Sequence, residues 1–135
     1  MIAHDFRSNA NGVMPEEDIA EISQALVETT NRYPAKGNVV SMIFYQELHV
    51  YVDNGKTFDG KAGGMTSPGA GALFGDVYTD DIDRLYSDTV SFEYQSTPVY
   101  FSVLFFDGNS KLLGHFQSGA VSVVTGIGGG AGSWS

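Results

Sequence analysis

Two segments of the chain, 54 positions apart, carry the same pattern of strand, turn and strand. In each, an apolar run leads to an aspartate (Asp53 or Asp107), a lysine follows within the turn, and a glycine stands seven positions after the aspartate. A unit of this kind that occurs once in each half of the chain predicts an antiparallel β structure built from two similar halves. No other feature of the sequence constrains the architecture as strongly.

Alternating apolar residues extend this pattern from about residue 39 to residue 125. Strands are predicted at 39–52 (one bent strand or two short ones), 56–65, 69–78, 88–96, 99–106, 111–118 and 120–125, with a short helix over 79–87 between the halves. The side chains expected to point inward include Phe44, Phe92, Phe101, Val103 and Phe105. About eight strands with frequent glycine turns favour a barrel or a sandwich, and a barrel of that size is filled by its own side chains.

The first 37 residues follow a different pattern. Residues 1–13 are small and polar, whereas Pro15, the acidic residues after it and apolar residues at helical spacing predict an amphipathic helix over about 15–29. Pro34 and Gly37 are typical of a linker. We therefore expect residues 1–37 to be an N-terminal arm that is dispensable for folding, and residues 38–135 to be the β domain.

Composition excludes several classes of function. The net charge is −9 and the few basic residues are scattered, so no nucleic-acid partner is expected. The chain has no cysteine, which excludes disulfides, thiol catalysis and thiolate metal sites. No stretch approaches the ~20 apolar residues of a membrane-spanning helix. The first residues lack the apolar core of a signal peptide, as a processed secreted chain also would.

Motifs that would indicate a cofactor or metal site do not have the required context. Gly126–Ala131 matches the G-x-G-x-x-A pattern of dinucleotide binding, but four residues follow it, so a close-packed terminal turn is the better interpretation. His4, His49 and His115 are too dispersed for a metal site, and the last two are expected on the surface. Trp134 is expected to plug one end of the barrel. The sequence thus assigns no catalytic, cofactor-binding or metal-binding residue.

The predicted strand 99–106 has an outward face that is unusually apolar. Tyr100, Leu104 and Phe106 lie on this face and are the candidates for a surface contact with lipid. In the alternative interpretation, the helix over 15–29 covers Leu104 and Phe106 and no lipid binds. Acidification toward the isoelectric point of about 4.4 would weaken repulsion from anionic lipid. Lipid association is therefore expected to be stronger at about pH 4.5–5 than at pH 7.

Several strings of residues are shared with a known family. They are Gly55-Lys56-Thr57-Phe58, Ala62-Gly63-Gly64, Pro68-Gly69-Ala70-Gly71, the run from Arg84 to Tyr94, Phe105-Phe106-Asp107, Leu113-Gly114-His115, and the run from Gly128 to Trp134. In these strings the chain resembles the Vap family, the virulence-associated proteins of pathogenic rhodococci and relatives of VapA. The resemblance extends over roughly residues 39–135.

The resemblance implies a closed eight-stranded antiparallel β-barrel made of two Greek-key halves with one helix. It also implies a secreted or surface-exposed, non-enzymatic protein that acts in the host macrophage phagosome, with host membrane lipid or a host protein as its partner. The family has no established catalytic residues, so none is carried over, and no cofactor is implied. We expect the chain to be a monomer.

Two alternatives to this function stay open on sequence alone. The first is a barrel that carries a small ligand, and a filled interior would argue against it. The second is a hydrolase with an unrecognised site, which a cleft containing carboxylates with strongly shifted pKa values would support.

Overall fold

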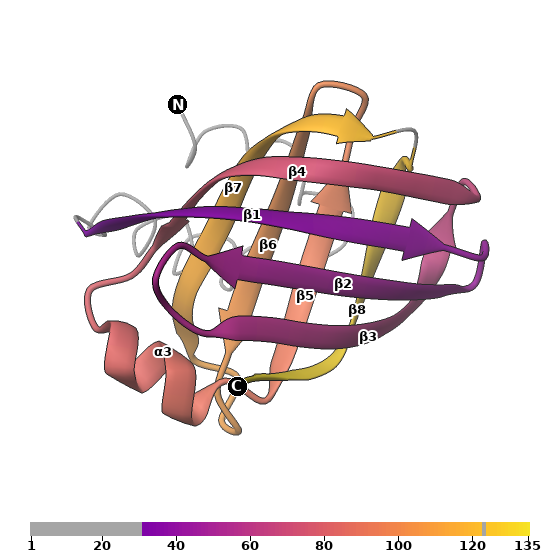
Figure 1. The fold of residues 1–135 in the computed structure, drawn as a ribbon. Helices are drawn as coiled ribbons and strands as arrows, with labels where there is room; N and C mark the ends of the chain where they lie inside the picture. Colours follow the sequence, from indigo (N-terminus) through magenta and orange to yellow (C-terminus); the bar gives the residue numbers. More distant parts are fainter. Residues whose placement is uncertain (1–30, 123) are drawn as a thin grey trace, which may run out of the picture. The chain divides into compact units, whose positions relative to one another are not determined.

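The computed structural model describes residues 31–122 and 124–135, and these form a closed antiparallel β-barrel with one short helix (Figure 1). Its strands are β1 (Arg32–Ser41), β2 (Tyr45–Val52), β3 (Thr57–Thr66), β4 (Gly69–Tyr78), β5 (Ser91–Ser96), β6 (Tyr100–Phe106), β7 (Leu112–Ser122) and β8 (Gly126–Trp134). The helix α3 (Ile82–Asp88) connects β4 to β5, close to its predicted position.

The strand order around the barrel is the same in both halves of the chain. The order is β1-β2-β3-β8-β5-β6-β7-β4, and β4 pairs with β1 to close the ring. In each half, three consecutive strands form hairpins and the fourth lies beside the first, which is the strand order of a Greek key. The halves join through the β3–β8 and β4–β7 pairs. The predicted closed barrel with eight antiparallel strands is confirmed.

The strand count is correct, but the last two predicted strands are not. β7 spans Leu112–Ser122 and so joins most of the segments 111–118 and 120–125 in a single strand, and the eighth strand is the glycine-rich segment that was expected to form a terminal turn. This strand, β8, pairs with both β3 and β5. A Cβ atom on Gly130 would lie 2.0 Å from the carbonyl oxygen of Lys61. Glycine is depleted in most strands, but here it allows adjacent strands to approach closely.

The first strand also begins earlier than the sequence indicated. β1 starts at Arg32, so the predicted boundary after residue 37 lies inside a strand. Residues from Arg32 pair with β4, and those from Ala35 pair with β2. At Pro34 the strand pairs with β4 alone, so this stretch is an edge, where proline is tolerated. The Pro34 carbonyl accepts a hydrogen bond from the backbone N–H of Asp53 at 2.9 Å. The helix predicted over 15–29 lies outside the described residues.

The inward-facing positions change parity between β1 and β2. Val39 of β1 lies opposite Leu48 of β2, and opposite residues of an antiparallel pair share a face of the sheet. The buried positions are therefore odd in β1 and even in β2. Val40, an even position of β1, is therefore exposed, and Met42 and Phe44 are exposed in the turn between the two strands. The prediction that Phe44 points inward is wrong, because the period-two pattern was extended through the tight β1–β2 turn.

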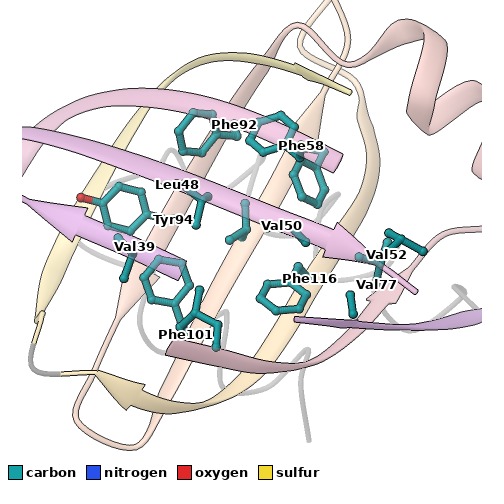
Figure 2. Packing of buried hydrophobic residues seen from close by; sticks show 14 of the residues in the cluster. Val39, Leu48, Val50, Val52, Phe58, Val77, Phe92, Tyr94, Phe101 and Phe116 are labelled. Carbon is teal, nitrogen blue, oxygen red and sulfur yellow. The ribbon is translucent and has the colours of Figure 1, made fainter. Parts of the chain in front are cut away.

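Large aromatic side chains fill the barrel interior (Figure 2). Five phenylalanines are almost completely buried, namely Phe58, Phe92, Phe101, Phe105 and Phe116. The ring of Phe58 meets those of Phe92 and Phe105 edge to face, with centroids 5.2 and 4.9 Å apart. The inward orientation predicted for Phe92, Phe101, Val103 and Phe105 is confirmed. An eight-stranded barrel is just wide enough for such side chains to occupy its lumen.

The helix α3 and Trp134 lie at one end of the barrel, which we call the helical end. Trp134 is buried, and its ring lies 5.2–5.4 Å from those of Tyr86, Phe58 and Phe105, in agreement with the predicted plug. The N-cap of α3 is Asp81, whose carboxylate accepts a hydrogen bond from the backbone N–H of Arg84 at 3.1 Å.

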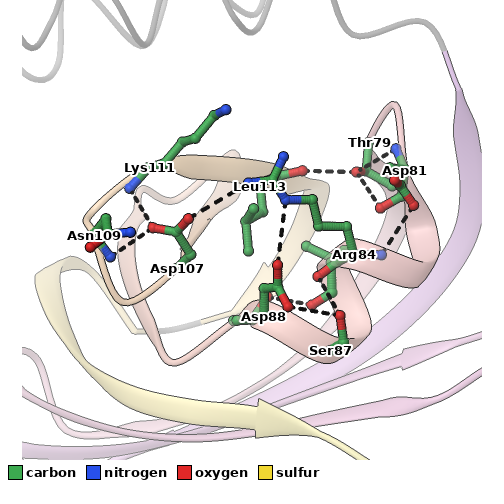
Figure 3. Close-up of polar contacts among 11 residues, drawn as sticks. Thr79, Asp81, Arg84, Ser87, Asp88, Asp107, Asn109, Lys111 and Leu113 are labelled. Atoms are coloured by element: carbon green, nitrogen blue, oxygen red, sulfur yellow. Dashed lines mark hydrogen bonds and ion pairs between the residues drawn. The ribbon is translucent and has the colours of Figure 1, made fainter.

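Thr79, two residues before the N-cap, fastens the start of this segment. Its hydroxyl donates to the carbonyl of Leu113 at 2.8 Å and so ties the segment before α3 to β7 (Figure 3). The guanidinium of Arg84 lies 3.4 Å from Asp88 and 3.9 Å from Asp107, which links α3 to the β6–β7 turn. These contacts hold α3 in place over the helical end.

The two aspartates of the repeat do not occupy equivalent positions. In the β6–β7 turn, the N–H of Asp107 donates to the carbonyl of Lys111, and in the β2–β3 turn Val52 makes the corresponding bond to Lys56. Val52, and not Asp53, therefore corresponds to Asp107, and Asp53 stands one position later in its turn. The Asp107 carboxylate accepts hydrogen bonds from the backbone of Asn109 and Lys111, which holds its pKa below the usual range. The two turns are equivalent in topology, as the repeat predicts, but the aspartates stand one position apart within them.

The limits of β1 change what a truncation of the N-terminus is expected to do. A chain that begins at Asn38 lacks six of the ten residues of β1, with their pairs to β2 and β4, and should lose its cooperative thermal transition because only four residues of β1 are left to close the barrel. A chain that begins at Asn31 keeps all eight strands and should retain the transition. Circular dichroism melting of both variants tests this. Cooperative melting of the shorter chain would contradict it.

Candidate functional site

Exposed apolar side chains gather at the end of the barrel opposite α3. This end is formed by the β1–β2, β3–β4, β5–β6 and β7–β8 turns. We define the apolar end by five side chains that are between 40% and 72% exposed, namely Met42, Ile43, Phe44, Met65 and Ile127. Isolated exposed apolar residues are ordinary on protein surfaces, whereas a group at one place indicates a contact surface.

Hydrogen bonds and strand pairing connect the residues of the apolar end. The backbone N–H of Thr66 donates to the carbonyl of Ile43 at 3.0 Å, which fastens the β1–β2 turn to the end of β3. Met65 is the register partner of Ile127 on β8, so these two exposed side chains are cross-strand neighbours. The five residues thus lie on segments that are directly bonded to one another at one end of the barrel.

The turns at the apolar end carry no charge. Residues 41–45, 65–69, 96–100 and 124–127 include no Asp, Glu, Lys, Arg or His. The connections at the helical end, 53–56, 79–90 and 107–111, contain six aspartates against three basic residues. The acidity of the chain is therefore unevenly distributed, and the apolar end is uncharged in a protein whose net charge is −9.

Ile43 at the apolar end has an unfavourable backbone conformation. Its φ of 71° places a β-branched residue in the left-handed region, which costs roughly 1–2 kcal/mol. Neighbouring groups hold it there. Its N–H donates to the Ser41 hydroxyl at 3.3 Å, and its carbonyl accepts from the Gln46 side-chain amide at 3.0 Å. Strain of this kind is common at functional sites.

The sequence-predicted contact residues lie elsewhere, on β6. Leu104 and Phe106 are 4% and 7% exposed, and Tyr100 is half-buried. Their alternation with Phe101, Val103 and Phe105 does place them on the outer face of the strand, but Leu104 and Phe106 offer little surface in this conformation. A lipid contact at these residues stays a prediction. Sequence reasoning missed the apolar end, whose signal was the uninterrupted run Met42-Ile43-Phe44-Tyr45 beside a strand end.

His115 is almost completely buried, which corrects its predicted surface position. Its ring stacks on that of Tyr78 with centroids 4.9 Å apart, and its Nδ1 lies 3.1 Å from the side-chain amide of Gln117. Its Nε2 has no hydrogen-bond partner in the described part of the chain. Burial disfavours the charged ring and lowers the pKa of His115 to about 3. Of the other two histidines, His49 is half-buried and His4 lies outside the described residues.

The buried His115 should make the barrel less stable in acid. At His115 the unfolded chain takes up a proton near pH 6.5, whereas the folded chain takes it up only near pH 3. The free energy of unfolding is therefore highest above pH 6.5 and decreases as the pH falls toward 3. At pH 5 the loss is roughly 2 kcal/mol. In His115→Gln, the difference in unfolding free energy between pH 7 and pH 5, measured with urea, should shrink by about that amount. An unchanged difference would contradict the assignment.

A hydrolytic site is not assembled from the most suggestive residues. His49 Nδ1 lies 2.6 Å from the Asp59 carboxylate, and Ser133 also neighbours Asp59 in the strand register. The aspartate stands between the other two, whereas a relay requires the histidine in the middle. Adjacent strands are about 4.8 Å apart, so His49 and Ser133 are roughly 10 Å from each other. This arrangement does not activate the serine as a nucleophile.

The described residues include no group of three or more His, Asp or Glu side chains suited to a metal ion. Residues 31–122 and 124–135 also contain no helix long and apolar enough to cross a membrane.

Comparison with known proteins identifies the class to which the barrel belongs. The family model described as "Rhodococcus equi virulence-associated protein" matches residues 1–135. The chain therefore belongs to this family, as the resemblance in its sequence implied.

Solved structures from Rhodococcus equi share both fold and sequence with the chain. VapB is 51% identical, with a TM-score of 0.74, and the match covers 78% of this chain and 96% of VapB. VapD is 43% identical, with a TM-score of 0.76, and the match covers 78% of this chain and 97% of VapD. Both are described as proteins of an intracellular pathogen. A search of curated proteins finds no match.

Proposed function

We propose that this chain is a secreted, monomeric, non-enzymatic virulence protein that acts in the host macrophage phagosome by docking its apolar end onto a membrane. Membership of the virulence-associated family supports the role in virulence. The observation that supports the membrane contact is the coincidence of exposed apolar side chains and absent charge at one end of the barrel.

The distribution of charge favours a contact driven by apolar burial. A net charge of −9 opposes approach to anionic lipid, but the charge-free turns can meet the bilayer with little desolvation cost. Burying a fully exposed apolar side chain contributes roughly 1.5–3 kcal/mol. The five side chains of the apolar end are already partly covered, so the expected binding is weak and reversible. It is the mode of a protein that lies on a membrane rather than one that spans it.

The interior and the His49–Asp59 arrangement support this function over the two alternatives. A carrier needs space for its ligand, whereas phenylalanine rings in mutual contact occupy the lumen. A hydrolase needs its nucleophile beside its base, and Ser133 is separated from His49 by the Asp59 strand.

Two phenylalanines with similar exposure provide a matched test. Phe44 at the apolar end is 66% exposed, and Phe74 in β4 is 60% exposed. In flotation with phosphatidylcholine liposomes, Phe44→Ser should bind about tenfold more weakly than the native chain, because a largely exposed phenylalanine contributes roughly 1–2 kcal/mol when buried in lipid. Phe74→Ser should bind like the native chain. Equal loss in the two variants, or no flotation of the native chain, would overturn the proposal.

The charge distribution also predicts how pH acts on binding. On liposomes that contain anionic lipid, association should be stronger at pH 5 than at pH 7, because carboxylates begin to protonate and the repulsion fades. His115 does not add to this effect, since burial keeps it neutral at pH 5. On purely zwitterionic liposomes the two pH values should give similar binding. Flotation at both pH values with each lipid composition checks this, and an equal response with both compositions would contradict it.

A further inference from the structure

A groove of about 460 Å³ runs along the outer surface of β2, β3 and β8, on the side of the barrel. Its lining includes Glu47, His49, Asp59, Lys61, Val90 and Ala131. None of these residues belongs to the apolar end. The volume lies within the range of roughly 300–1,000 Å³ that small-molecule sites occupy. The membrane contact proposed above makes no use of this surface.

Four polar side chains form one wall of the groove, in two neighbouring rows. Glu47 of β2 lies opposite Lys61 of β3, and His49 lies opposite Asp59 in the adjacent row. The Asp59 carboxylate contacts His49 Nδ1 at 2.6 Å, which fixes the orientation of the imidazole. The wall therefore offers hydrogen-bond acceptors and a strong donor at defined positions.

Small and apolar residues form the rest of the groove. Ala131 is the register partner of Lys61, and it projects only a methyl group from β8. Val90, after α3, is half exposed and borders the same space. The Cβ that Gly132 lacks would lie 2.3 Å from the ring of Phe58, so this glycine is required by the core. The groove exists because the outward side chains of β8 are small, whereas those of β2 and β3 beside them are long and polar.

The lining indicates the chemistry of a ligand. Carboxylates and an ammonium stand side by side in the wall, so neither a phosphate nor a polyamine meets a field of a single sign. Glu47 and Asp59 can accept hydrogen bonds from hydroxyl groups, and Lys61 can donate to hydroxyl oxygens. Ala131 and Val90 present carbon atoms on which the C–H face of a sugar ring can pack. We propose that the groove binds a short, uncharged saccharide.

The test is a heteronuclear NMR titration of the full chain with a panel of neutral mono- and disaccharides. At least one member should shift the backbone amides of Asp59, Lys61 and Ala131 in a saturable way, with dissociation constants in the millimolar range that is ordinary for an open site. Ala131→Leu fills the groove and should weaken this binding at least tenfold. Its matched control is Ala72→Leu on β4, which is also exposed and lies outside the groove lining, and which should bind normally.

Further variants and probes make the outcome decisive. Glu47→Gln keeps the shape of the wall but removes a charged acceptor, and it should also weaken binding while leaving the melting temperature unchanged. No saturable shift with any saccharide, or equal shifts in Ala131→Leu and the native chain, would overturn the proposal. Tighter binding of inorganic phosphate or spermidine at the same amides would overturn the assigned ligand class. Liposome flotation of Ala131→Leu should match the native chain, so the failure of one proposal leaves the other standing.

Discussion

The barrel depends on how closely β8 can approach its two neighbours. A side chain on Gly130 would strike the backbone of β3, and one on Gly132 would strike the ring of Phe58. Gly60 of β3 has the same relation to the rings of Phe58 and Phe92. The absent side chains and the large rings are therefore complementary, because the rings take the interior volume that the glycines leave. Without this complementarity β8 could not join the two halves, and the ring would stay open at β3 and β5.

Closure of the ring separates the molecule into regions with different surface chemistry. Alternate connections along the chain lie at the same end of the barrel, so residues distant in sequence meet at each end. One end collects Met42, Phe44, Met65 and Ile127 with no charge, and the other collects the aspartates around α3. The sides of the barrel form a third region, where the polar groove runs along β8. A barrel whose described interior is filled by its own side chains thus presents outer surfaces of different chemistry.

The sequence predicted the architecture well because period-two alternation and turn residues act locally. It predicted the short helix before β5 and the inward orientation of Phe92, Phe101 and Phe105 for the same reason. It failed where pairing with distant strands decides the outcome. The glycine-rich segment at 126–134 has no strand propensity of its own and becomes β8 only between β3 and β5.

The errors at the candidate site have related causes. The alternation through Phe44 was extended across a turn whose geometry reverses the faces of the sheet. The burial of His115 and Leu104 depends on contacts that alternation within one strand does not reveal. The apolar end is formed by turns that come together only when the ring closes, so no single stretch of sequence marks it as one surface.

The left-handed conformation of Ile43 places stability and surface chemistry in opposition at a single position. Glycine or asparagine would adopt this φ at lower cost, and either would remove an apolar side chain from the end of the barrel. In a library of variants selected only for resistance to heat, glycine and asparagine should therefore become frequent at position 43. In a library selected for action on host cells, isoleucine should persist. Comparing the two libraries would separate the requirements of folding from those of virulence at the level of one residue.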